Sequence, residues 1–566
     1  MPRLSVALCA TLLLGCGSSQ PGAGGTGGST GATGGSIGTG GSPPAIGTPM
    51  EPGDPGAADV TFTIRTDMDV HPISPLIYGW NGADAIADDG QTVVRAGGNR
   101  WTAYNWENNA SNAGSDYLFQ NDDYLDSSTA PGDAVKSTLD PAKSHGAAAL
   151  ITIPIVDYVA ADTSPGGNVQ NSGSDYLMTR FKQNAPAKGS AFTLTPSTSD
   201  AHVYQDEFAN WVKANYGAQQ VVFSLDNEPD LWYQTHAEVH PDQVTYAELV
   251  MRNTEYAAAV KAVWPAAEVA GFVSYGWYGY EALQEMSPLT DMMTYGEFLT
   301  YYLDQMKAAE QTAGKRLVDY LDLHWYPETY VSDGYMGQST TRIIDQQDPS
   351  SAIQTARLQA PRSLWDPNYN ENNWIAQSIP GPIMLIPRLK QKIAAHYPGT
   401  KLSFSEYTYG GGHDITGGVA EADVLGIFGR EGVDMATAWN WPDSNDGNVY
   451  EIAGLKAFRN YDGNGATFGD VSIHGVTTDD AASSVYASVD SADPNRVVIV
   501  AINKKTTSAT AGIKVAHPTA FTAADVYTLT SAGPTLAAAP SLSAIATNAF
   551  RYAMPPISVS VILLKP

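Results

Sequence analysis

The sequence predicts an α/β fold, a (β/α)8 TIM barrel followed by a C-terminal all-β sandwich. Three observations support this. Between about residues 76 and 441 there are eight short apolar runs, each bounded by turn signals, and most of the intervals between them carry a helical pattern. Apolar strands alternating with amphipathic helices are typical of a parallel sheet covered by helices, and eight such repeats match a closed barrel. The last hundred residues have short alternating runs without a helical pattern, which indicates a sandwich.

The eight predicted strands run over Leu76–Trp80, Thr92–Gly97, Ala148–Ile155, Gln220–Asn227, Ala267–Tyr275, Val318–Tyr326, Lys401–Tyr407 and Met435–Trp441. The clearest predicted helices are His202–Gly217, Asp242–Trp264, Tyr295–Gly314, Pro382–Tyr397 and Val419–Glu431. In the first of these helices the helical period puts Phe208, Trp211, Val212 and Tyr216 on one face, as expected for a helix that packs against a sheet.

The N-terminus has the features of an export signal. Residues 4–14 form an apolar run of eleven after Arg3, too short to span a bilayer and typical of a signal peptide. The run ends in Leu13-Leu14-Gly15-Cys16, which resembles a bacterial lipoprotein cleavage box except for Leu at its second position. We therefore expect residues 1–16 to be a signal peptide and Cys16 a lipid-bearing N-terminus, with an ordinary cleaved signal as the alternative.

Residues 17–57 have the composition of a flexible linker. From Gly17 to Gly56, 15 of 40 residues are glycine, interleaved with Ser, Thr and Pro, and such a segment cannot bury enough apolar surface to order itself. We expect an extracellular protein held at the cell surface by a lipid anchor and this tether. Residues 58–72 are predicted to add a strand, over Val60–Ile64, to the edge of the sandwich; 73–457 are predicted as the barrel and 458–566 as the sandwich.

Charge and cysteine content exclude several classes of function. The 566-residue chain has 59 acidic and 31 basic residues and a net charge of −28, so phosphate backbones repel it and nucleic-acid binding is not expected. Its two cysteines, Cys9 and Cys16, both lie in the signal segment. The folded part therefore has no thiol nucleophile and no cysteine-based zinc site.

Polar residues at the ends of the predicted barrel strands identify a candidate active site, because barrel enzymes carry theirs at the C-terminal strand ends. The fourth strand runs into Asn227-Glu228-Pro229 and the seventh into Glu406-Tyr407, while the sixth ends in His324-Trp325-Tyr326 and the eighth in Trp439-Asn440-Trp441. Because Pro229 disfavours the helical region for the residue before it, we expect Glu228 to lie on an extended backbone.

Two carboxyl groups across a barrel mouth suit glycosidic-bond hydrolysis, in which one acid protonates the leaving oxygen and a second carboxylate stabilises or captures the sugar cation. Tyr326 is expected to donate a hydrogen bond to Glu406 and keep it ionised. Trp439 is expected to form the floor on which the sugar stacks, and Asn227 to bind a sugar hydroxyl. Any one of these residues is ordinary in a strand; their combination is specific.

The stretches Arg100–Asn109 (RWTAYNWENN) and Asp226–Trp232 (DNEPDLW) resemble glycoside hydrolase family 44, within the retaining barrel glycosidases of clan A. The resemblance covers roughly residues 60–566. It implies an endo-β-1,4-glucanase or xyloglucanase built from a barrel and a sandwich of both chain ends, with Glu228 as acid/base and Glu406 as nucleophile. Tyr407-Thr408-Tyr409-Gly410 departs from the pattern expected after the nucleophile.

Further residues are expected to contact substrate, with core packing as the alternative for each aromatic. They are His324 on the sixth strand, and Trp101, Asn105, Trp106 and Trp232 in the loops, with Tyr104, Tyr117, Tyr275 and Trp277 as weaker candidates. No cofactor is required. A structural calcium ion stays open, because Glu107, Asp122, Asp123 and Asp126 are clustered without the spacing of a calcium loop, and Asp443–Asn448 begins like such a loop and then departs from it.

The sequence thus predicts a surface-tethered retaining endo-glycosidase whose partner is a β-glucan, with xyloglucan favoured by the resemblance. Two alternatives remain. A mannanase or xylanase of the same clan would have the same carboxylates. A non-catalytic polysaccharide-binding protein would keep the aromatics but would not need both glutamates.

Overall fold

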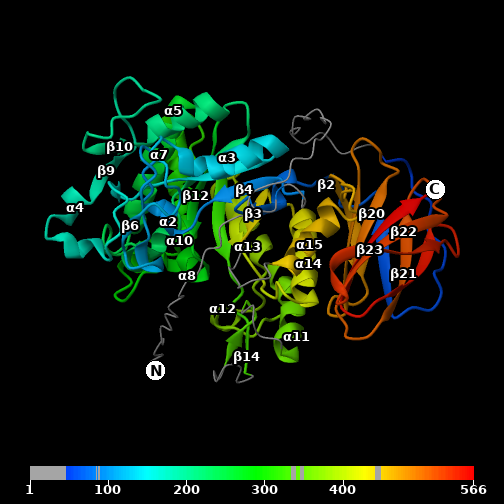
Figure 1. The fold of residues 1–566 in the computed structure, drawn as a ribbon. Coiled ribbons are helices and arrows are strands. Elements are labelled where there is room, and N and C mark those ends of the chain that lie inside the picture. The colour runs from blue at the N-terminus through cyan, green and yellow to red at the C-terminus, as the bar shows by residue number, and fades with distance from the viewer. Residues whose placement is uncertain (1–45, 84–85, 87–89, 333–339, 345–349, 440–447) are drawn as a thin grey trace, which may run out of the picture.

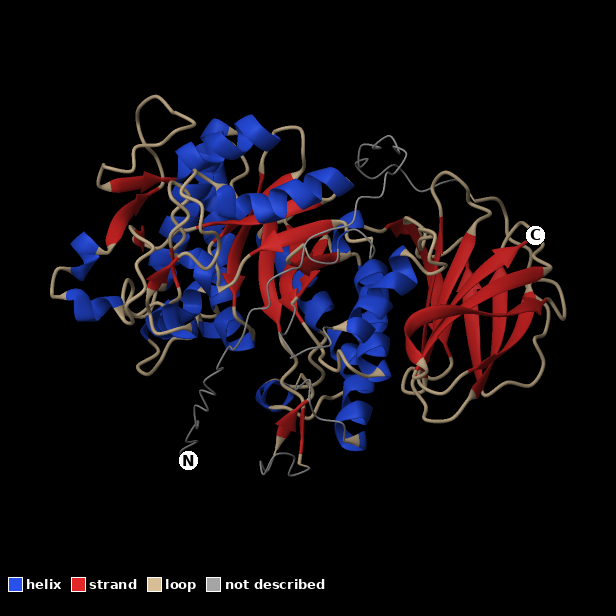
Figure 2. Ribbon diagram, in the orientation of Figure 1, coloured by secondary structure: helices blue, strands red, loops and turns tan. Residues whose placement is uncertain are grey.

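The computed structural model describes residues 46–83, 86, 90–332, 340–344, 350–439 and 448–566. Eight parallel strands form a closed barrel, in the order β3-β4-β7-β11-β12-β13-β16-β17 and back to β3 (Figures 1 and 2). Their bounds are β3 Gly79–Asn81, β4 Val93–Ala96, β7 Ala148–Ile153, β11 Val221–Leu225, β12 Glu268–Ser274, β13 Tyr320–Trp325, β16 Lys401–Tyr407 and β17 Met435–Ala438. The structure has a barrel strand at each of the eight predicted places, most of them shorter than predicted. The first prediction, Leu76–Trp80, is wrong at its start, because Pro75–Ile77 form a short 3-10 helix and the strand begins at Gly79.

The helices that surround the barrel contain the five predicted ones and others that the sequence analysis did not name. They include α3 Asp133–His145, α5 Gln205–Tyr216, α7 Tyr246–Val263, α10 Phe298–Ala313, α13 Leu385–His396, α14 Ile415–Glu431 and α15 Val449–Arg459. Helix α5 starts later than predicted because His202–Tyr204 pairs with a neighbouring strand instead. Helix α14 starts earlier, where the Asp414 side chain caps it by accepting a hydrogen bond of 2.7 Å from the Thr416 amide.

Short elements fill the loops between these strands and helices. They are η1 Pro75–Ile77, α2 Asn99–Thr102, β5 Ser111–Asn112, η2 Gly114–Asp116, β6 Asn121–Asp122, β8 Tyr158–Ala160, η3 Val169–Ser172, α4 Tyr176–Thr179, β9 Phe181–Ala185, β10 His202–Tyr204, η4 Pro229–Leu231, α6 Trp232–Thr235, α8 Trp277–Ala282, α9 Thr290–Tyr295, β14 Tyr330–Val331, β15 Thr341–Arg342, α11 Ser351–Gln359, η6 Ala360–Leu364 and α12 Trp374–Ser378.

The barrel interior changes from apolar to polar along the strands. Side chains alternate between the two faces of a strand. Outward side chains such as Phe404 pack on helices, and its ring stacks on Phe428 of α14 with centroids 5.5 Å apart. Inward side chains near the strand starts form a separate apolar cluster of Leu76, Val93, Ala148, Leu150, Val222, Ala270, Tyr320 and Met435. The next inward residues are polar and buried, among them Arg95, Thr152, Ser224, Asp322, Ser403 and Thr437.

The C-terminal region is a sheet with the strand order β23-β22-β25-β20-β19-β18-β1-β21-β24, with β2 paired to β18. The bounds are β1 Val60–Arg65, β2 His71–Pro72, β18 Val471–Thr477, β19 Ser483–Val489, β20 Val497–Asn503, β21 Ala509–Ala516, β22 Ala523–Thr530, β23 Gly533–Ser543, β24 Ala549–Met554 and β25 Ser558–Lys565. The sheet folds over its own apolar core, so that its two end strands contact each other.

Strand β1 joins this sheet as predicted, but the expected edge position is wrong. It lies between β18, to which it is antiparallel, and β21, to which it is parallel. Val60, Phe62 and Ile64 point into the core of the sheet and are buried. Their alternation is that of any half-buried strand, so the sequence pattern gives no information on the number of neighbours.

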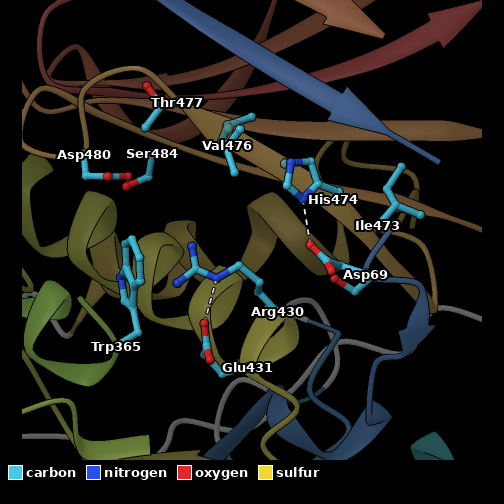
Figure 3. Close-up of a pocket in the computed structure, with 13 residues that line it drawn as sticks. Asp69, Trp365, Arg430, Glu431, Ile473, His474, Val476, Thr477, Asp480 and Ser484 are labelled. Atoms are coloured by element: carbon cyan, nitrogen blue, oxygen red, sulfur yellow. Dashed lines mark hydrogen bonds and ion pairs between the residues drawn. The ribbon is translucent and has the colours of Figure 1, made fainter. Parts of the chain in front are cut away.

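The barrel and the sandwich share a packed junction built on α14. The Lys504 ammonium lies 2.7 Å from Oδ2 of Asp423, with 1% of each side chain exposed, and Tyr486 donates a hydrogen bond of 2.6 Å to the same carboxylate. A cavity of about 310 Å³ opens beside this junction, lined by Trp365, Arg430 and residues of β18 and β19 (Figure 3). It is remote from the strand ends that hold the candidate catalytic residues.

Several sequence predictions lie outside the described residues: the signal peptide with Cys16, most of the 17–57 linker, Asn440 and Trp441, and the Asp443-Ser444-Asn445-Asp446-Gly447 stretch. Helix α15 runs to Arg459 and so crosses the predicted barrel boundary at 457. Across the part of the chain that is described, no helix has the length and apolar character needed to cross a membrane.

Candidate active site

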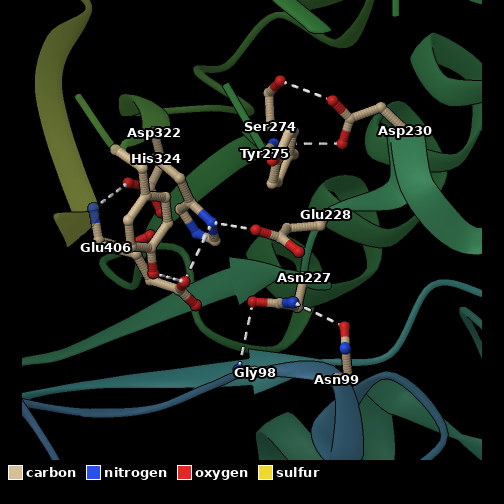
Figure 4. Close-up of polar contacts among 12 residues, drawn as sticks. Gly98, Asn99, Asn227, Glu228, Asp230, Ser274, Tyr275, Asp322, His324 and Glu406 are labelled. Atoms are coloured by element: carbon tan, nitrogen blue, oxygen red, sulfur yellow. Dashed lines mark hydrogen bonds and ion pairs between the residues drawn. The ribbon is translucent and has the colours of Figure 1, made fainter. Parts of the chain in front are cut away.

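The two strand-end glutamates face one another across the barrel mouth, with His324 of β13 between them (Figure 4). Nδ1 of His324 lies 2.8 Å from Oε1 of Glu228 and 3.4 Å from Oε2 of Glu406. One nitrogen of the imidazole and one oxygen of each carboxyl group all lie within 4.8 Å of one another. Glu228, His324 and Glu406 are far apart in the sequence, and the fold brings them into a single buried cluster.

Glu228 does not have the extended backbone that the following proline predicted. Its φ of 45° and ψ of 54° lie in the left-handed region, and Pro229 begins the short helix η4. Proline excludes the right-handed helical region for the residue before it, and the turn selects the left-handed alternative. In this conformation the Glu228 amide donates a hydrogen bond of 2.9 Å to the carbonyl of Val273 at the end of β12.

Glu406 is held by donors from two other strands. Nη1 of Arg95 donates a hydrogen bond of 2.6 Å to Oε1, and the Tyr326 hydroxyl donates one of 2.6 Å to Oε2. Burial alone would raise the pKa of this carboxyl group. The positive potential of His324 and Arg95, with the hydrogen bonds from Tyr326 and Arg95, outweighs burial and holds the pKa below its usual range.

The pKa of Glu228 moves the opposite way. Burial raises it well above the usual value, and the negative charge of Glu406 raises it further, while Arg95 opposes both. As the pH rises, Glu406 therefore ionises before Glu228, and the proton that the pair keeps longer lies on Glu228. Two nearby carboxyl groups with opposite shifts are the pattern of a nucleophile and an acid.

Arg95 is the central residue that the sequence analysis missed. Besides Glu406 it donates hydrogen bonds to Oδ1 of Asn81, at 2.9 Å, and to Oδ1 of Asn227, at 2.8 Å. The signal was present, because an arginine stands in the middle of the apolar run Thr92–Gly97, where a charge is tolerated only if it is paired inside the barrel.

Asn227 and Trp439 also lie at this mouth. Oδ1 of Asn227 accepts hydrogen bonds from Arg95 and from the Gly98 amide, at 3.2 Å, and its Nδ2 points to Asn99. Trp439 is half-buried, and a Cβ atom on Gly98 would lie 3.0 Å from its ring. Only glycine at position 98, with φ of 97°, lets the loop approach the indole this closely.

Four other predicted binding residues are packed into the structure. Trp106 (1% exposed) stacks on Phe208, with centroids 5.5 Å apart, and Trp232 has no exposed surface. Asn105, also fully buried, donates a hydrogen bond to the Ala160 carbonyl, and Trp101 (7% exposed) packs its edge on Tyr104. Asn105, Trp106 and Trp232 have almost no exposed surface for a sugar and pack the loop wall, and Trp101 has little.

The weaker aromatic candidates divide in the same way. Tyr104 and Trp277 are buried, at 1% and 7% exposure. Tyr117 and Tyr275 are exposed, at 51% and 37%, and Tyr275 follows β12 beside the cluster (Figure 4). The amide of Tyr275 donates a hydrogen bond of 3.2 Å to Asp230, a buried residue of η4 that the sequence analysis did not single out.

The acidic residues considered for calcium do not gather into one site. Glu107 pairs with Lys182 at 2.5 Å and Asp122 with Arg100 at 2.6 Å, so these two carboxylates already face cations. Oδ1 of Asp126 accepts a hydrogen bond from the Ser128 amide. Within the described residues the side chains close enough together to share a metal ion are Glu228, His324 and Glu406.

Comparisons with known proteins agree on one family. The model of glycoside hydrolase family 44 matches residues 110–329. Endoglucanase A of Paenibacillus lautus is 39% identical over 526 residues, which cover 90% of this chain and 73% of that protein. A Paenibacillus polymyxa xyloglucanase of family 44, solved with xyloglucan, superposes with a TM-score of 0.84 at 39% identity, covering 90% of this chain and 99% of that one. A family 44 endoglucanase of Clostridium thermocellum superposes with a TM-score of 0.83 at 39% identity, covering 90% and 100%.

Proposed function

The chain belongs to glycoside hydrolase family 44, and from this membership we propose that it is a retaining endo-glycosidase that cleaves β-1,4-glucan backbones, with xyloglucan as the favoured substrate. The observation that carries the mechanism is that the pKa values of the two facing carboxyl groups shift in opposite directions, down for Glu406 and up for Glu228. The names of the relatives support the substrate class.

In the first step Oε of Glu406 attacks the anomeric carbon while the bond from that carbon to the leaving oxygen breaks. Glu228 gives its proton to that oxygen, so the leaving chain departs as a neutral alcohol. In the second step water attacks the anomeric carbon, Glu228 takes the proton of that water, and the bond to Glu406 breaks. Two inversions give retention of configuration.

The separation of the carboxyl groups supports retention over inversion. Oxygens of Glu228 and Glu406 lie within 4.8 Å of each other, with His324 Nδ1 between them. Retaining enzymes hold their carboxyl groups about 5–5.5 Å apart, whereas inverting enzymes need about 6.5–9.5 Å to admit a water molecule between carboxylate and sugar.

The surrounding residues support the same roles. Arg95 and Tyr326 keep Glu406 anionic by donating to both of its oxygens. Trp439 gives the mouth an aromatic face on which a sugar ring can stack, since the C–H faces of a pyranose are apolar. Asn227 stands next to the acid and offers an amide for a sugar hydroxyl.

We also propose that the protein is exported and held at the cell surface. The support is the apolar segment ending at Cys16 and the glycine-rich stretch after it. Labelling of cells with a radioactive fatty acid tests this proposal: wild type takes up label, and Cys16→Ser does not. Unlabelled wild-type protein would contradict the anchor.

Reducing-end release on xyloglucan, carboxymethyl-cellulose, mannan and xylan tests the catalytic proposal, with wild type beside Glu228→Gln and Glu406→Gln. We expect activity on the glucans, highest on xyloglucan, and loss of at least about 10²–10⁴-fold in both variants. Unchanged thermal unfolding of the variants is the control. Activity on mannan or xylan alone would overturn the substrate, and binding without hydrolysis would overturn the enzyme reaction.

A further inference from the structure

Beneath the catalytic pair the barrel interior contains a group of buried polar atoms that make no hydrogen bond of regular geometry among the described residues, although two of them, serine hydroxyls, interact with a neighbouring aspartate. They are Oδ2 of Asp322, Nε2 of His324, and the hydroxyl oxygens of Ser403 and Ser405. All four side chains are fully buried. Buried polar groups in folded proteins are nearly always bonded to protein or to ordered water, so this group, and above all Nε2 of His324, indicates a ligand.

The strand register brings these four residues together. Strands β13 and β16 are neighbours, and Asp322 is the direct partner of Ser403. His324 lies two residues beyond Asp322, on the same inward face of β13, and neighbouring strands are about 4.8 Å apart. The Ser405 amide donates a hydrogen bond of 3.0 Å to Oδ1 of Asp322. Burial raises the pKa of this carboxyl group, and the nearby hydroxyls of Ser403 and Ser405 oppose that effect.

This polar layer is enclosed above and below. The apolar cluster that includes Val93, Tyr320 and Met435 fills the barrel toward the strand starts, and Glu228 and Glu406 lie toward the strand ends. Water is the ligand that fits such a place, because it is small, and in buried sites it typically makes about three hydrogen bonds to polar groups that lack other partners.

We propose that these atoms bind ordered water, and that Asp322 is a positioning residue that acts on the catalytic pair through this water and His324. The positioning role rests on the proposed function. The water donates one hydrogen to Nε2 of His324 and the other to Oδ2 of Asp322, and its oxygen accepts from the hydroxyls of Ser403 and Ser405. Each of these buried groups then has a partner.

This arrangement fixes the tautomer of His324. If Nε2 accepts from the water, the ring proton is on Nδ1, which then donates to Oε1 of Glu228 and faces the anionic Glu406. The acidic proton of Glu228 is left on its other oxygen, free for the leaving group. The water thereby holds both the ring and the acid in a productive orientation.

Charged and titratable groups from every side face His324. The charged groups are Glu228 and Asp230 after β11, Glu406 of β16, Arg95 of β4 and Asp322 of β13. Two tyrosines lie beside them: Tyr326 follows β13 and donates to Glu406, and Tyr280 of α8 donates to the His324 carbonyl. Burial lowers the pKa of His324, while the charge of Asp322 opposes that effect. Removing this negative charge therefore lowers the pKa values of the groups around it.

A high-resolution crystal structure of the unliganded protein tests the water site without substrate. We expect ordered water within about 2.7–3.2 Å of both Oδ2 of Asp322 and Nε2 of His324. The same site should lose its water or show displaced water in Ser403→Ala/Ser405→Ala. A dry site in wild type would overturn the proposal.

The pH profile of kcat/KM tests the positioning role in Asp322→Asn, which keeps the shape of the side chain and removes its charge. We expect kcat to fall by about ten- to a hundredfold with KM unchanged. The alkaline limb should move to lower pH by about half a unit or more, because the negative charge of Asp322 acts on His324, which bonds to Glu228, and the variant lacks this charge. A merely structural defect would not displace this limb.

Thr152→Val is the matched control, since Thr152 is a buried inward residue of β7 whose hydroxyl already donates to the Ala96 carbonyl. Its alkaline limb should coincide with that of wild type. If Asp322→Asn does not fold, the serine double variant takes its place, with loss of kcat at constant KM as the expected result. A limb that does not move, or that moves equally in the control, would overturn the positioning role. An inactive wild type would overturn the proposed function and the positioning role. The crystal structure would still show whether the water site exists.

Discussion

Nη1 of Arg95 lies 2.6 Å from Oε1 of Glu406, and this contact joins the second barrel strand to the seventh. The guanidinium is fully buried and only 5% of the glutamate side chain is exposed. A hydrogen bond between two charged groups is short and strong. Arg95 bonds to Oε1 only, and the Tyr326 hydroxyl donates to Oε2 of Glu406. The two donors together make Glu406 the anionic member of the pair.

Arg95→Met should therefore raise the pKa of Glu406. The proposed mechanism requires Glu406 to be ionised, so the acid limb of kcat/KM should move to higher pH. On the same proposal kcat should fall by about 10²–10³-fold, the loss typical of one buried donor at a reacting group. Arg95→Lys should restore little, because an ammonium cannot reach Asn81, Asn227 and Glu406 at once as the guanidinium does.

The control for Arg95 is Arg65→Met on strand β1. Arg65 also pairs with carboxylates, at 3.1 Å, but its side chain is 25% exposed and lies in the sandwich. Its pH–rate profile should match wild type. An acid limb that stays in place in Arg95→Met would refute the role of Arg95.

Tyr326→Phe removes only the hydroxyl that donates to Oε2 of Glu406. The acid limb should again move to higher pH, by less than in Arg95→Met since Arg95 remains, and kcat should fall about tenfold, the size of one lost hydrogen bond to a charged group. The same kinetic measurement on Tyr552→Phe, whose hydroxyl bonds Ser560 in the sandwich, should show no change. Equal pH–rate profiles for wild type, Tyr326→Phe and Tyr552→Phe would count against this prediction.

Glu421→Gln should stabilise the protein at alkaline pH. Burial, then the nearby charge of Glu451, raises the pKa of Glu421 to about 8, and the Tyr407 hydroxyl donates to it at 2.8 Å. A carboxyl whose folded pKa is raised contributes stability that is fully present below its unfolded pKa, near 4.3, and is lost as pH rises to about 8.

Thermal unfolding as a function of pH checks this. Glutamine resembles the protonated carboxyl, so the variant and wild type should melt together near pH 4, and the variant should melt at a higher temperature near pH 9. Glu51→Gln serves as the control because that side chain is 72% exposed. A constant difference across the pH range would mean that Glu421 does not titrate in this window.

Lys504→Met should weaken the junction between sandwich and barrel. It leaves Asp423 buried with a charge that Lys504 no longer balances, which typically costs about 3–5 kcal/mol. Lys565→Met breaks an equivalent pair with Asp525 that is 46% and 44% exposed, and should cost less than about 1 kcal/mol. Urea unfolding of both variants gives the comparison, and equal losses would refute the structural role of the buried pair.

Much of the fold and part of the site could be predicted from local patterns. Eight apolar runs separated by amphipathic helices are enough for a barrel, because each strand must be covered by a helix on its outer face. Once the strands are counted, the residues that end them converge at one mouth. Glu228, Glu406, His324 and Tyr326 were found in this way, and the structure brings all four within one cluster.

The structure differs from the sequence predictions where a local pattern is compatible with more than one structure. Trp106 and Trp232 look like sugar platforms in the sequence, yet both are buried, because an aromatic residue in a loop is equally suited to a core and to a ligand. The place of β1 in the interior of its sheet, and the left-handed backbone of Glu228, depend on contacts with β21 and with Val273 that no nearby residue encodes.

The sequence by itself therefore determined the architecture and the identity of the two glutamates, since periodicity and strand ends are properties of neighbouring residues. The tertiary structure decided that the pKa values of the two carboxyl groups shift in opposite directions. Arg95, Tyr326 and His324 come from different positions along the chain, and the potential they create at Glu406 and Glu228 depends on distances of a few ångströms within a buried, low-dielectric interior. Such distances arise only when the barrel closes.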